Sequence, residues 1–319
     1  MLRYILKRTV IALITVLVLI TIIFALVRML PGDPFISEKT NPAIRDKMMA
    51  YYGLDKPLWR QWLTYVGNML HGDLGVSLKY PGRTVNSTIQ QTFPYSAGLG
   101  VRALLVALSA GLFLGTMAAQ KAGKALDVVC VLIAIIGISM PDFIIGTVLQ
   151  LVFAIKLKWL PAAQWESWRH MILPVVALSL YTLALITRLM RSSMLEVTHQ
   201  DYILTARAKG LSPRQVIWRH EMRNAILPIV TIMGPITAAV LTGTFVLERI
   251  YAIPGMGKFY VQSISDLDYT MVLGMTAFYG VFLVAANLIV DILYGIIDPR
   301  IKLAGARGRI VAMDEDEED

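Results

Sequence analysis

Charged residues are scarce in this sequence. Asp, Glu, Lys and Arg make up 16% of the 319 residues, whereas a soluble globular domain carries about a quarter. Apolar residues make up 56%, and the mean hydropathy is +0.61. The apolar residues fall in blocks of about 20 residues, the length at which a helix crosses the hydrocarbon core of a bilayer. The composition therefore excludes an ordinary soluble protein and indicates a chain for which the membrane is the solvent.

Cysteine and histidine are also rare. The single cysteine, Cys130, lies in an apolar block, so no intrachain disulfide can form. The four histidines, His71, His170, His199 and His220, are scattered along the chain. No pair of them has the i, i+4 spacing of two metal ligands on one helix, and we expect no metal site.

A Gly-rich phosphate-binding loop that ends in Lys-Ser or Lys-Thr is missing. The nearest fragment, Gly255–Phe259, lacks the spacing and the hydroxyl. No nucleophile and base stand at a spacing that would suit a membrane-embedded hydrolase. We therefore expect no catalytic residues, and ATP would have to be hydrolysed by another chain.

Six apolar segments are long enough to span the membrane. They are Thr9–Met29, Ser96–Gln120, Asp127–Ile155, Met171–Met190, Ala225–Leu247 and Met271–Ile297. The first segment follows Arg3, Lys7 and Arg8, as in a signal peptide, but it is too long for one and ends without a small-residue cleavage site. We therefore expect an all-α polytopic membrane protein whose residues 1–30 hold the N-terminal cytoplasmic end and an uncleaved first helix.

Small residues mark two of these spans. Gly111 and Gly115 form a small-xxx-small pair in the second span, which predicts close helix contact. Gly137, Pro141 and Gly146 interrupt the third span and predict a kink. Packing is favoured over a gating hinge, because Gly and Pro are ordinary in membrane helices.

Lys and Arg set the orientation, because positively charged flanks stay in the cytoplasm. With the N-terminus inside, sixteen Lys and Arg residues face the cytoplasm, and five lie in the two short outer connections. Six spans then place both termini in the cytoplasm. Residues 301–319 form a cytoplasmic tail that ends in six consecutive acidic residues, and we expect this tail to be disordered.

Residues 31–95 form the longest hydrophilic stretch, lie outside and are too long for a simple loop. After Pro57, apolar residues recur at helical spacing and predict an amphipathic helix. They are Leu58, Trp59, Trp62, Leu63, Val66, Met69 and Leu70. Two interpretations stay open: a helix on the outer lipid surface, a depth that Trp favours, and a cap that receives a substrate-delivery protein.

The cytoplasmic connection at about 191–224 is far longer than two neighbouring helices need. Gly210 is placed to end one helix, and Ser212 and Pro213 are placed to cap and start the next. The pattern predicts a helix–turn–helix elbow. A basic helix on anionic lipid is the plain alternative, and a DNA-binding elbow is weaker because both ends are tethered to the bilayer.

The side chains of this elbow suit contact with another protein. Ala206 and Ala208 are short, so a partner's surface can approach the backbone. Arg207, Lys209 and Arg214 can pair with carboxylates on that surface.

The elbow resembles the ATPase-docking loop of ABC importer permeases of the dipeptide/oligopeptide/nickel family, and in particular an oligopeptide permease B-type subunit. The similarity starts at Asp201-Tyr202 and continues through Thr205–Leu211. Further similar positions cover nearly the whole chain: Arg219-His220, Arg223–Pro228, Pro31–Pro34, Gly72–Ser77, Ile253–Gly257, Asn287 and Asp298–Arg300. Leu204 stands where the broader importer pattern has a glutamate, a departure typical of the peptide branch.

The resemblance implies a type I ABC importer permease fold with six membrane helices, with residues 96–300 as the permease core and a small extracytoplasmic helical region. It implies import of oligopeptides or dipeptides, driven by ATP and Mg held on partner ATPases, with no cofactor bound by this chain. The implied partners are a second permease subunit in a heterodimer, two ABC ATPases, an extracytoplasmic peptide-binding protein and membrane lipid, but no nucleic acid. The implied docking residues are Asp201, Tyr202, Thr205, Ala206, Arg207, Ala208, Lys209, Gly210 and Leu211.

Three polar residues are candidates for the substrate pathway. Asn287 and Asp291 lie one turn apart in the sixth span, where polar groups are costly, although interhelical hydrogen bonding is the favoured role. Arg102, near the outer end of the second span, can reach the headgroups or face the pathway. Nickel or glutathione transport within the family, and an ion-coupled secondary transporter from another class, stay open as alternatives.

Overall fold

The structure is a computed structural model that describes residues 2–29, 53–80, 82–241 and 245–297. Within these ranges the chain is helical, apart from connecting turns and one isolated antiparallel bridge between Val76 and Thr84. The predicted all-α architecture is confirmed. Pro31–Pro34, Asp298–Arg300 and the tail at 301–319 lie outside the described residues.

Five helices are long and apolar enough to cross a membrane, and a bent pair of helices makes a sixth span if it is counted as one. The five are α1 Leu2–Met29, α4 Val85–Gln120, α7 Trp168–Thr198, α11 Leu227–Leu241 with α12 Phe245–Ile250, and α14 Tyr269–Ile297. α4 begins eleven residues before the predicted Ser96, because the Thr84 hydroxyl caps it by accepting a hydrogen bond from the Ser87 amide at 3.0 Å. The helix therefore extends into the region expected to be extracytoplasmic.

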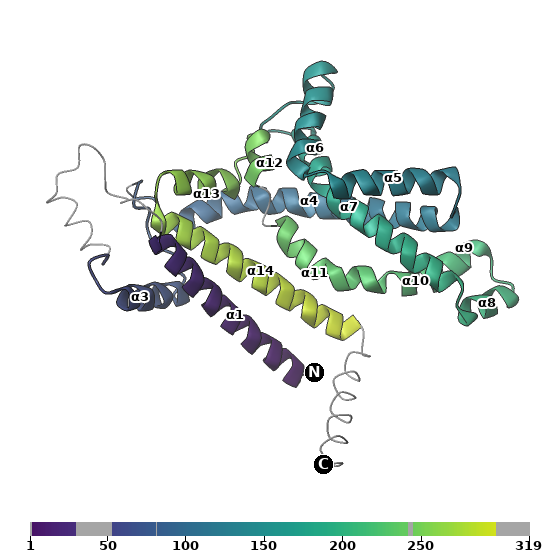
Figure 1. Cartoon of the computed structure of the whole chain (residues 1–319), viewed down its shortest axis with the longest axis horizontal. Coiled ribbons are helices and arrows are strands. Elements are labelled where there is room, and N and C mark those ends of the chain that lie inside the picture. Colours follow the sequence, from purple (N-terminus) through teal and green to yellow (C-terminus); the bar gives the residue numbers. More distant parts are fainter. Residues whose placement is uncertain (1, 30–52, 81, 242–244, 298–319) are drawn as a thin grey trace, which may run out of the picture.

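The third predicted span, Asp127–Ile155, is not one continuous helix. It consists of α5 Ala125–Ser139 and α6 Asp142–Leu149, and α6 continues as the π-helix η1 Gln150–Lys156. The two parts meet at 110°, so that α6 leaves the direction of α5 while it still packs against α7 (Figure 1). Met140 is extended, with φ −105° and ψ 128°, because a residue before proline is pushed out of the helical region. The predicted kink is confirmed, but the backbone is fully broken there.

α4 and α7, the second and fourth predicted spans, pack closely against each other at two glycines of α4. An ideal Cβ atom on Gly115 would lie 2.6 Å from Met190 Cβ and 2.7 Å from the Thr187 carbonyl oxygen. On Gly111 it would lie 2.9 Å from Ile186 Cβ. The small-xxx-small pair thus lets the backbone of α4 reach α7, and Ile186 and Met190 are fully buried in the contact. This contact agrees with packing, and not a gating hinge, as the favoured role of these glycines.

α1 and α14 run side by side, and both lie toward the end of the molecule where α3 Leu58–Leu70 is found (Figure 1). α3 covers the residues of the predicted amphipathic helix, which is thus confirmed. The Trp62 indole donates a hydrogen bond to the Thr21 hydroxyl of α1 at 3.1 Å. Since Thr21 lies eight residues before the end of α1, α3 sits beside the C-terminal part of a helix that is long and apolar enough to cross a membrane, which agrees with the lipid-surface interpretation.

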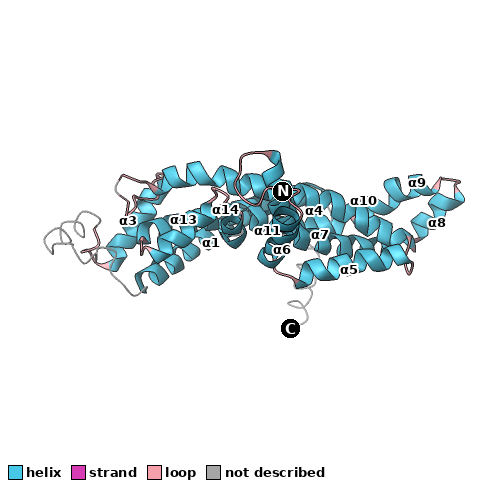
Figure 2. Cartoon of the chain, turned by 90° about the horizontal axis from the view of Figure 1, so that it is seen from above, coloured by secondary structure: helices cyan, strands magenta, loops and turns pink. Residues whose placement is uncertain are grey.

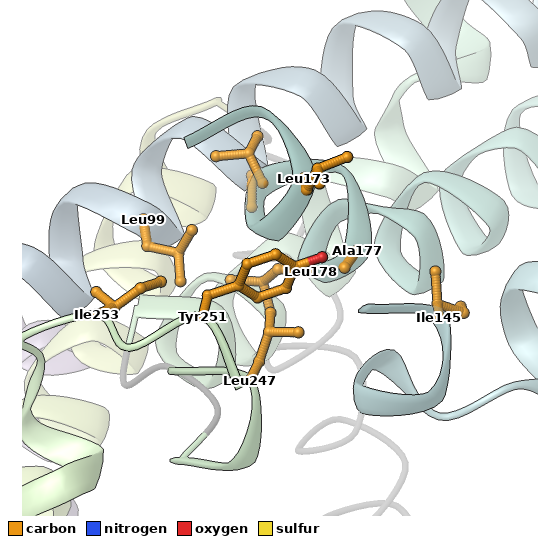
Figure 3. Close-up of a cluster of buried hydrophobic side chains, with 10 residues drawn as sticks. Leu99, Ile145, Leu173, Ala177, Leu178, Leu247, Tyr251 and Ile253 are labelled. Atoms are coloured by element: carbon orange, nitrogen blue, oxygen red, sulfur yellow. The ribbon is translucent and has the colours of Figure 1, made fainter. Parts of the chain in front are cut away.

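A buried cluster fixes α6 to the helices around it. Figure 3 shows the Tyr251 ring between Leu99 of α4 and Leu178 of α7, and its hydroxyl donates to the Gly146 carbonyl at 2.8 Å. An ideal Cβ on Gly146 would lie 2.5 Å from a Leu247 methyl group. Gly146 therefore serves close contact between α6 and α12.

The N-terminal ends of α4 and α14 are joined by the segment Gly72–Ser77. Buried Asp268 accepts hydrogen bonds from the Ser77 hydroxyl, from the Leu78 amide at 3.1 Å and from the Met271 amide at 3.2 Å. Nearby, Asp266 accepts a hydrogen bond from the Tyr80 hydroxyl at 2.7 Å, and this bond raises the pKa of Tyr80. These sequence positions therefore serve the fold, as an outer clamp between residues 72–78 and the start of α14.

Ile253–Gly257 has a similar structural role. Buried Glu248 accepts a hydrogen bond from the Gly257 amide at 2.8 Å, at the N-terminus of α13 Met256–Ser265. An ideal Cβ on Gly255 would lie 2.3 Å from the Glu248 carboxylate, so a larger residue would displace this carboxylate. The carboxylate replaces the missing side-chain cap of α13.

The start of α5 is tied to α7 by a charged pair. Arg191 Nε donates to Asp127 Oδ1 at 2.6 Å, Arg191 Nη2 donates to Oδ2 at 2.8 Å, and the Asp127 side chain is only 5% exposed. Asp127→Ala leaves the half-buried arginine unpaired, so we expect a loss of about 2 kcal/mol of stability, less than for a fully buried pair because Arg191 stays 30% exposed.

Thermal unfolding of the purified protein in detergent measures this loss. Asp55→Ala removes an exposed carboxylate and is the control. Equal unfolding temperatures for the two variants would show that the pair between Asp127 and Arg191 adds nothing.

Candidate docking site

The connection between α7 and α11 folds into the predicted elbow. α7 ends at Thr198 and is followed by α8 Asp201–Ala208, a turn, α9 Pro213–Val216, the π-helix η2 Ile217–Glu221 and α10 Met222–Ala225. Figure 2 places α8 and α9 at one end of the long axis and α3 at the other. The basic elbow and the expected extracytoplasmic helix thus lie at opposite ends of the molecule.

Three residues make the turn, as the sequence predicts. Gly210 has φ +78°, a left-handed conformation that costs a residue with a Cβ about 1 kcal/mol or more. Ser212 and Gln215 form a capping box, in which the Ser212 amide donates to Gln215 Oε1 at 2.9 Å. Pro213 occupies the first helical position. The sharp change of direction is therefore encoded locally.

The inner face of the elbow is a small apolar cluster. Ile203, Ala206 and Val216 are buried there, with Val197 and Leu211 packed against them. Ala206 therefore does not lie on the outer face, where its short side chain was expected to let a partner approach. It follows Ile203 by three residues, which places both on the same side of α8.

The outer face of α8 carries most of the predicted docking residues. Asp201, Tyr202, Thr205, Arg207, Ala208, Lys209 and Gly210 are exposed, and Leu211 is half-buried. Leu204, which was left out of the predicted set, is 55% exposed. Together with Tyr202 it puts apolar surface on the tip of a polar segment, as at a protein interface. The sequence did carry a signal for this residue, because Leu204 stands where the broader importer pattern has a glutamate.

Arg207 pairs within the chain. Its Nη2 atom lies 3.2 Å from Oε1 of Glu221, whose side chain is only 4% exposed. We expected this guanidinium to meet a carboxylate on a partner, and the pairing with Glu221 competes with that role. Lys209 and Arg214 are exposed, and no ion pair is found for either within the described ranges. Of the three basic residues expected to meet a partner, these two keep their charge without an ion pair among the described residues.

The elbow is joined rigidly to two membrane helices. α10 passes into α11 at Ile226, whose amide donates to the Met222 carbonyl at 3.0 Å and whose carbonyl accepts from the Val230 amide at 3.0 Å. Ala225 and Ile229 are buried in one cluster with Met194 of α7. The elbow is therefore packed against both α7 and α11.

A cavity of about 440 Å³ lies between the elbow and the membrane helices. Its walls include Gln120 at the end of α4, Thr198 at the end of α7, and Leu211 and Ile217 of the elbow. The elbow therefore stands clear of α4, and its contact with the bundle runs through α7 and α11.

Of the three candidate pathway residues, the structure describes the side chains of two, Arg102 and Asn287. Arg102 is exposed, donates to the Gly98 carbonyl at 2.7 Å and lies over the Trp165 ring, 5.8 Å from its centroid. Asn287 Oδ1 is buried without a hydrogen-bond partner. The side chain of Asp291 lies outside the described residues. In the part of the chain that the structure describes, no group of three His, Cys, Asp or Glu side chains could hold a metal ion.

Comparison with known families and proteins covers almost the whole chain. Residues 111–303 match the family described as the binding-protein-dependent transport system inner membrane component, and residues 1–99 match the N-terminal membrane component of the same systems.

Individual relatives align over their full length. The sequence is 46% identical to the dipeptide transport system permease protein DppB of Bacillus subtilis over 304 residues, which is 95% of this chain and 99% of that protein. It is 42% identical to the oligopeptide transport system permease protein OppB of Haemophilus influenzae, over 95% of this chain and all of that protein.

Proposed function

The chain belongs to the inner membrane components of binding-protein-dependent transport systems, and we propose that it works as the permease of an ATP-driven importer for dipeptides or oligopeptides. It is a multi-pass membrane component without catalytic chemistry of its own. The family implies a binding protein and ATPase partners. The permease relatives carry dipeptide and oligopeptide names at 39 to 46% identity, which supports peptides as the cargo.

The elbow carries the proposal. Its turn is built by local sequence, its inner face is packed, and its outer face exposes Tyr202, Leu204 and Lys209. A segment that only joined two membrane helices would not need a rigid protrusion with exposed apolar side chains. A separate ATPase that holds ATP and Mg is the partner that would use it.

The mechanism follows from the connections of the elbow. When two ATPase subunits close on ATP, the docked α8 moves with them. The packed cluster around Ile203 keeps the elbow rigid, so the movement passes to α7 and α11. A change in the position of these helices relative to a second permease subunit would open the pathway to one side of the membrane at a time. The chain therefore converts closure of the ATPases into a change of access.

The outer side receives the cargo in this proposal. A peptide-binding protein would dock at the end that carries α3 and the outer clamp, opposite the elbow (Figure 2). Both chain termini would then lie in the cytoplasm, as the distribution of Lys and Arg predicts.

Co-purification tests the docking assignment. The tagged chain, solubilised in mild detergent from cells that express the transport system, is expected to bring two ATPase subunits and one second permease with it. Tyr202→Asp with Leu204→Asp, which charges the exposed apolar tip, should remove the ATPases and keep the second permease. Full retention of the ATPases would contradict docking through this face.

Uptake measurements test the cargo. Cells that carry the complete system are given labelled dialanine, labelled glutathione or Ni²⁺, and uptake is compared with cells that lack this chain. We expect chain-dependent uptake of dialanine alone. Uptake of glutathione or Ni²⁺ without dialanine would assign one of the other cargo classes, and dialanine uptake by purified transporter in liposomes without ATP would indicate an ion-coupled transporter.

A further inference from the structure

The break between α5 and α6 opens a cavity of about 390 Å³, which we call the break cavity. Polar groups enter it from three helices: Ser139 ends α5, Asp142 begins α6, and Tyr181 and Thr182 belong to α7. Ala239 and Val240 of α11 complete the wall. The break cavity therefore lies against the two membrane helices, α7 and α11, that the elbow connects.

The break cavity lies within the thickness of the bilayer. α5 starts directly after the cytoplasmic turn at Lys121–Lys124 and has 15 residues, so at 1.5 Å per residue its end is about 22 Å from the cytoplasmic side. The hydrocarbon core is about 30 Å thick. Irregular backbone is tolerated at such a depth only where it is buried in protein or lines a water-filled cavity.

Asp142 is the ionisable group in the wall of this cavity. Its Oδ1 atom accepts a hydrogen bond from the amide of the next residue, Phe143, at 2.8 Å, and its side chain is partly exposed. No Lys, Arg or His lines the cavity, and no ion pair is found for Asp142 among the described side chains. A carboxylate at membrane depth without a counter-ion attracts a cation strongly, because the surrounding dielectric constant is low.

The other groups in the cavity also suit a cation. Tyr181 is 50% exposed, and the face of a tyrosine ring attracts an ammonium group. The hydroxyls of Ser139 and Thr182 can accept hydrogen bonds from it. Buried side chains beside the cavity fix the position of its walls. Ile145, one turn after Asp142, and Leu178, one turn before Tyr181, are both part of the cluster of Figure 3. A fixed cavity with one carboxylate, one aromatic ring and hydroxyls is matched to a protonated amine.

We propose that the break cavity binds the protonated amine of a peptide in transit, with Asp142 as a specificity-determining residue. The inference rests on the proposed peptide transport. Every unmodified peptide carries such a group at its amino terminus, whose pKa is about 8. A lysine side chain offers the same chemistry, and the experiment separates the two sources.

The plain alternative is that Asp142 only caps α6. Asp142→Asn distinguishes the roles, because the amide oxygen can still accept the hydrogen bond from the Phe143 amide while the charge is lost. Asp142→Glu keeps the charge. Asp55→Asn, the same change at an exposed position outside the spans, is the control.

Uptake is measured with the assembled transporter in liposomes. ATP is supplied on the side of the membrane that carries the ATPase subunits, and the binding protein on the opposite side. Each result is the ratio of wild-type to variant kcat/KM for one peptide, so that the preference of the binding protein cancels. The peptides are dialanine, N-acetyl-dialanine and N-acetyl-alanyl-lysine. Rates are normalised to the amount of assembled complex.

For Asp142→Asn we expect a ratio of about 10 with dialanine, the scale of one lost charge-assisted hydrogen bond, and about 1 with N-acetyl-dialanine. A ratio of about 10 with N-acetyl-alanyl-lysine means that any ammonium group is bound, and about 1 means the amino terminus alone. Asp142→Glu should restore at least part of the dialanine rate.

Equal ratios for dialanine and N-acetyl-dialanine would overturn the inference while leaving peptide transport in place. Failure of Asp142→Glu to restore any of the lost rate would also overturn it. Absence of dialanine uptake by the wild-type transporter would instead overturn the proposed function, and the inference would fall with it.

Discussion

Gly210→Trp is expected to abolish ATP-dependent uptake, with a loss of at least about 100-fold. Gly210 has φ +78°, so any residue with a Cβ strains the turn. No atom lies within 4 Å of the position of an added Cβ, so the chain itself leaves room for the indole on the face where we propose that an ATPase docks. The substitution therefore obstructs docking more than it disturbs the fold. Uptake by the assembled transporter and the amount of chain in the membrane are the two measurements.

Gly123→Trp is the matched control. Gly123 lies in the turn between α4 and α5, has φ +76° and has equally open surroundings. The backbone strain is the same, but the residue is not part of the elbow. Uptake by this variant should stay within about twofold of wild type. Equal loss in both variants would mean that the strained turn alone is responsible, and normal uptake with Gly210→Trp would contradict the docking assignment.

Gly115→Leu is expected to prevent the assembly of the bundle. The added Cβ would lie 2.6 Å from Met190 Cβ and 2.7 Å from a backbone carbonyl oxygen of α7, and a carbonyl oxygen cannot move aside as the end of a flexible side chain can. Separating α4 from α7 to admit leucine would cost more than the 1–3 kcal/mol typical of overpacking. Size-exclusion chromatography should then show little folded, monodisperse protein.

The same substitution at Gly67 gives the comparison. Gly67 lies in α3, and nothing lies within 4 Å of its added Cβ. Gly67→Leu should leave the yield unchanged. Normal yield and an unchanged unfolding temperature for Gly115→Leu would show that α4 and α7 do not approach as closely as described.

The elbow could be predicted from the sequence because its determinants are local. A glycine that needs a left-handed conformation, a serine cap and a proline at the first helical position act within four residues of one another. The spans were predictable for a related reason, since the apolar length needed to cross a bilayer is independent of the neighbours of a helix. The docking role itself remains a proposal.

Other features depend on contacts between distant residues, and the sequence alone did not show them. Close to the 110° break in the third span, the hydroxyl of Tyr251, which follows α12, donates to the Gly146 carbonyl; Pro141 alone indicated only a kink. The inward position of Ala206 depends on Val216, ten residues away on the other arm of the elbow. The ion pair between Arg207 and Glu221 exists only once the two arms lie together.

The outer clamp also has a consequence for biosynthesis. Asp268 bonds the Leu78 amide across 190 positions of the chain, and ribosomes add about 5–20 residues per second. About 10–40 s therefore pass between the emergence of the two partners. During this interval Ser77 and Leu78 lack the carboxylate that accepts their hydrogen bonds, and water or the insertion machinery takes its place until the start of α14 arrives.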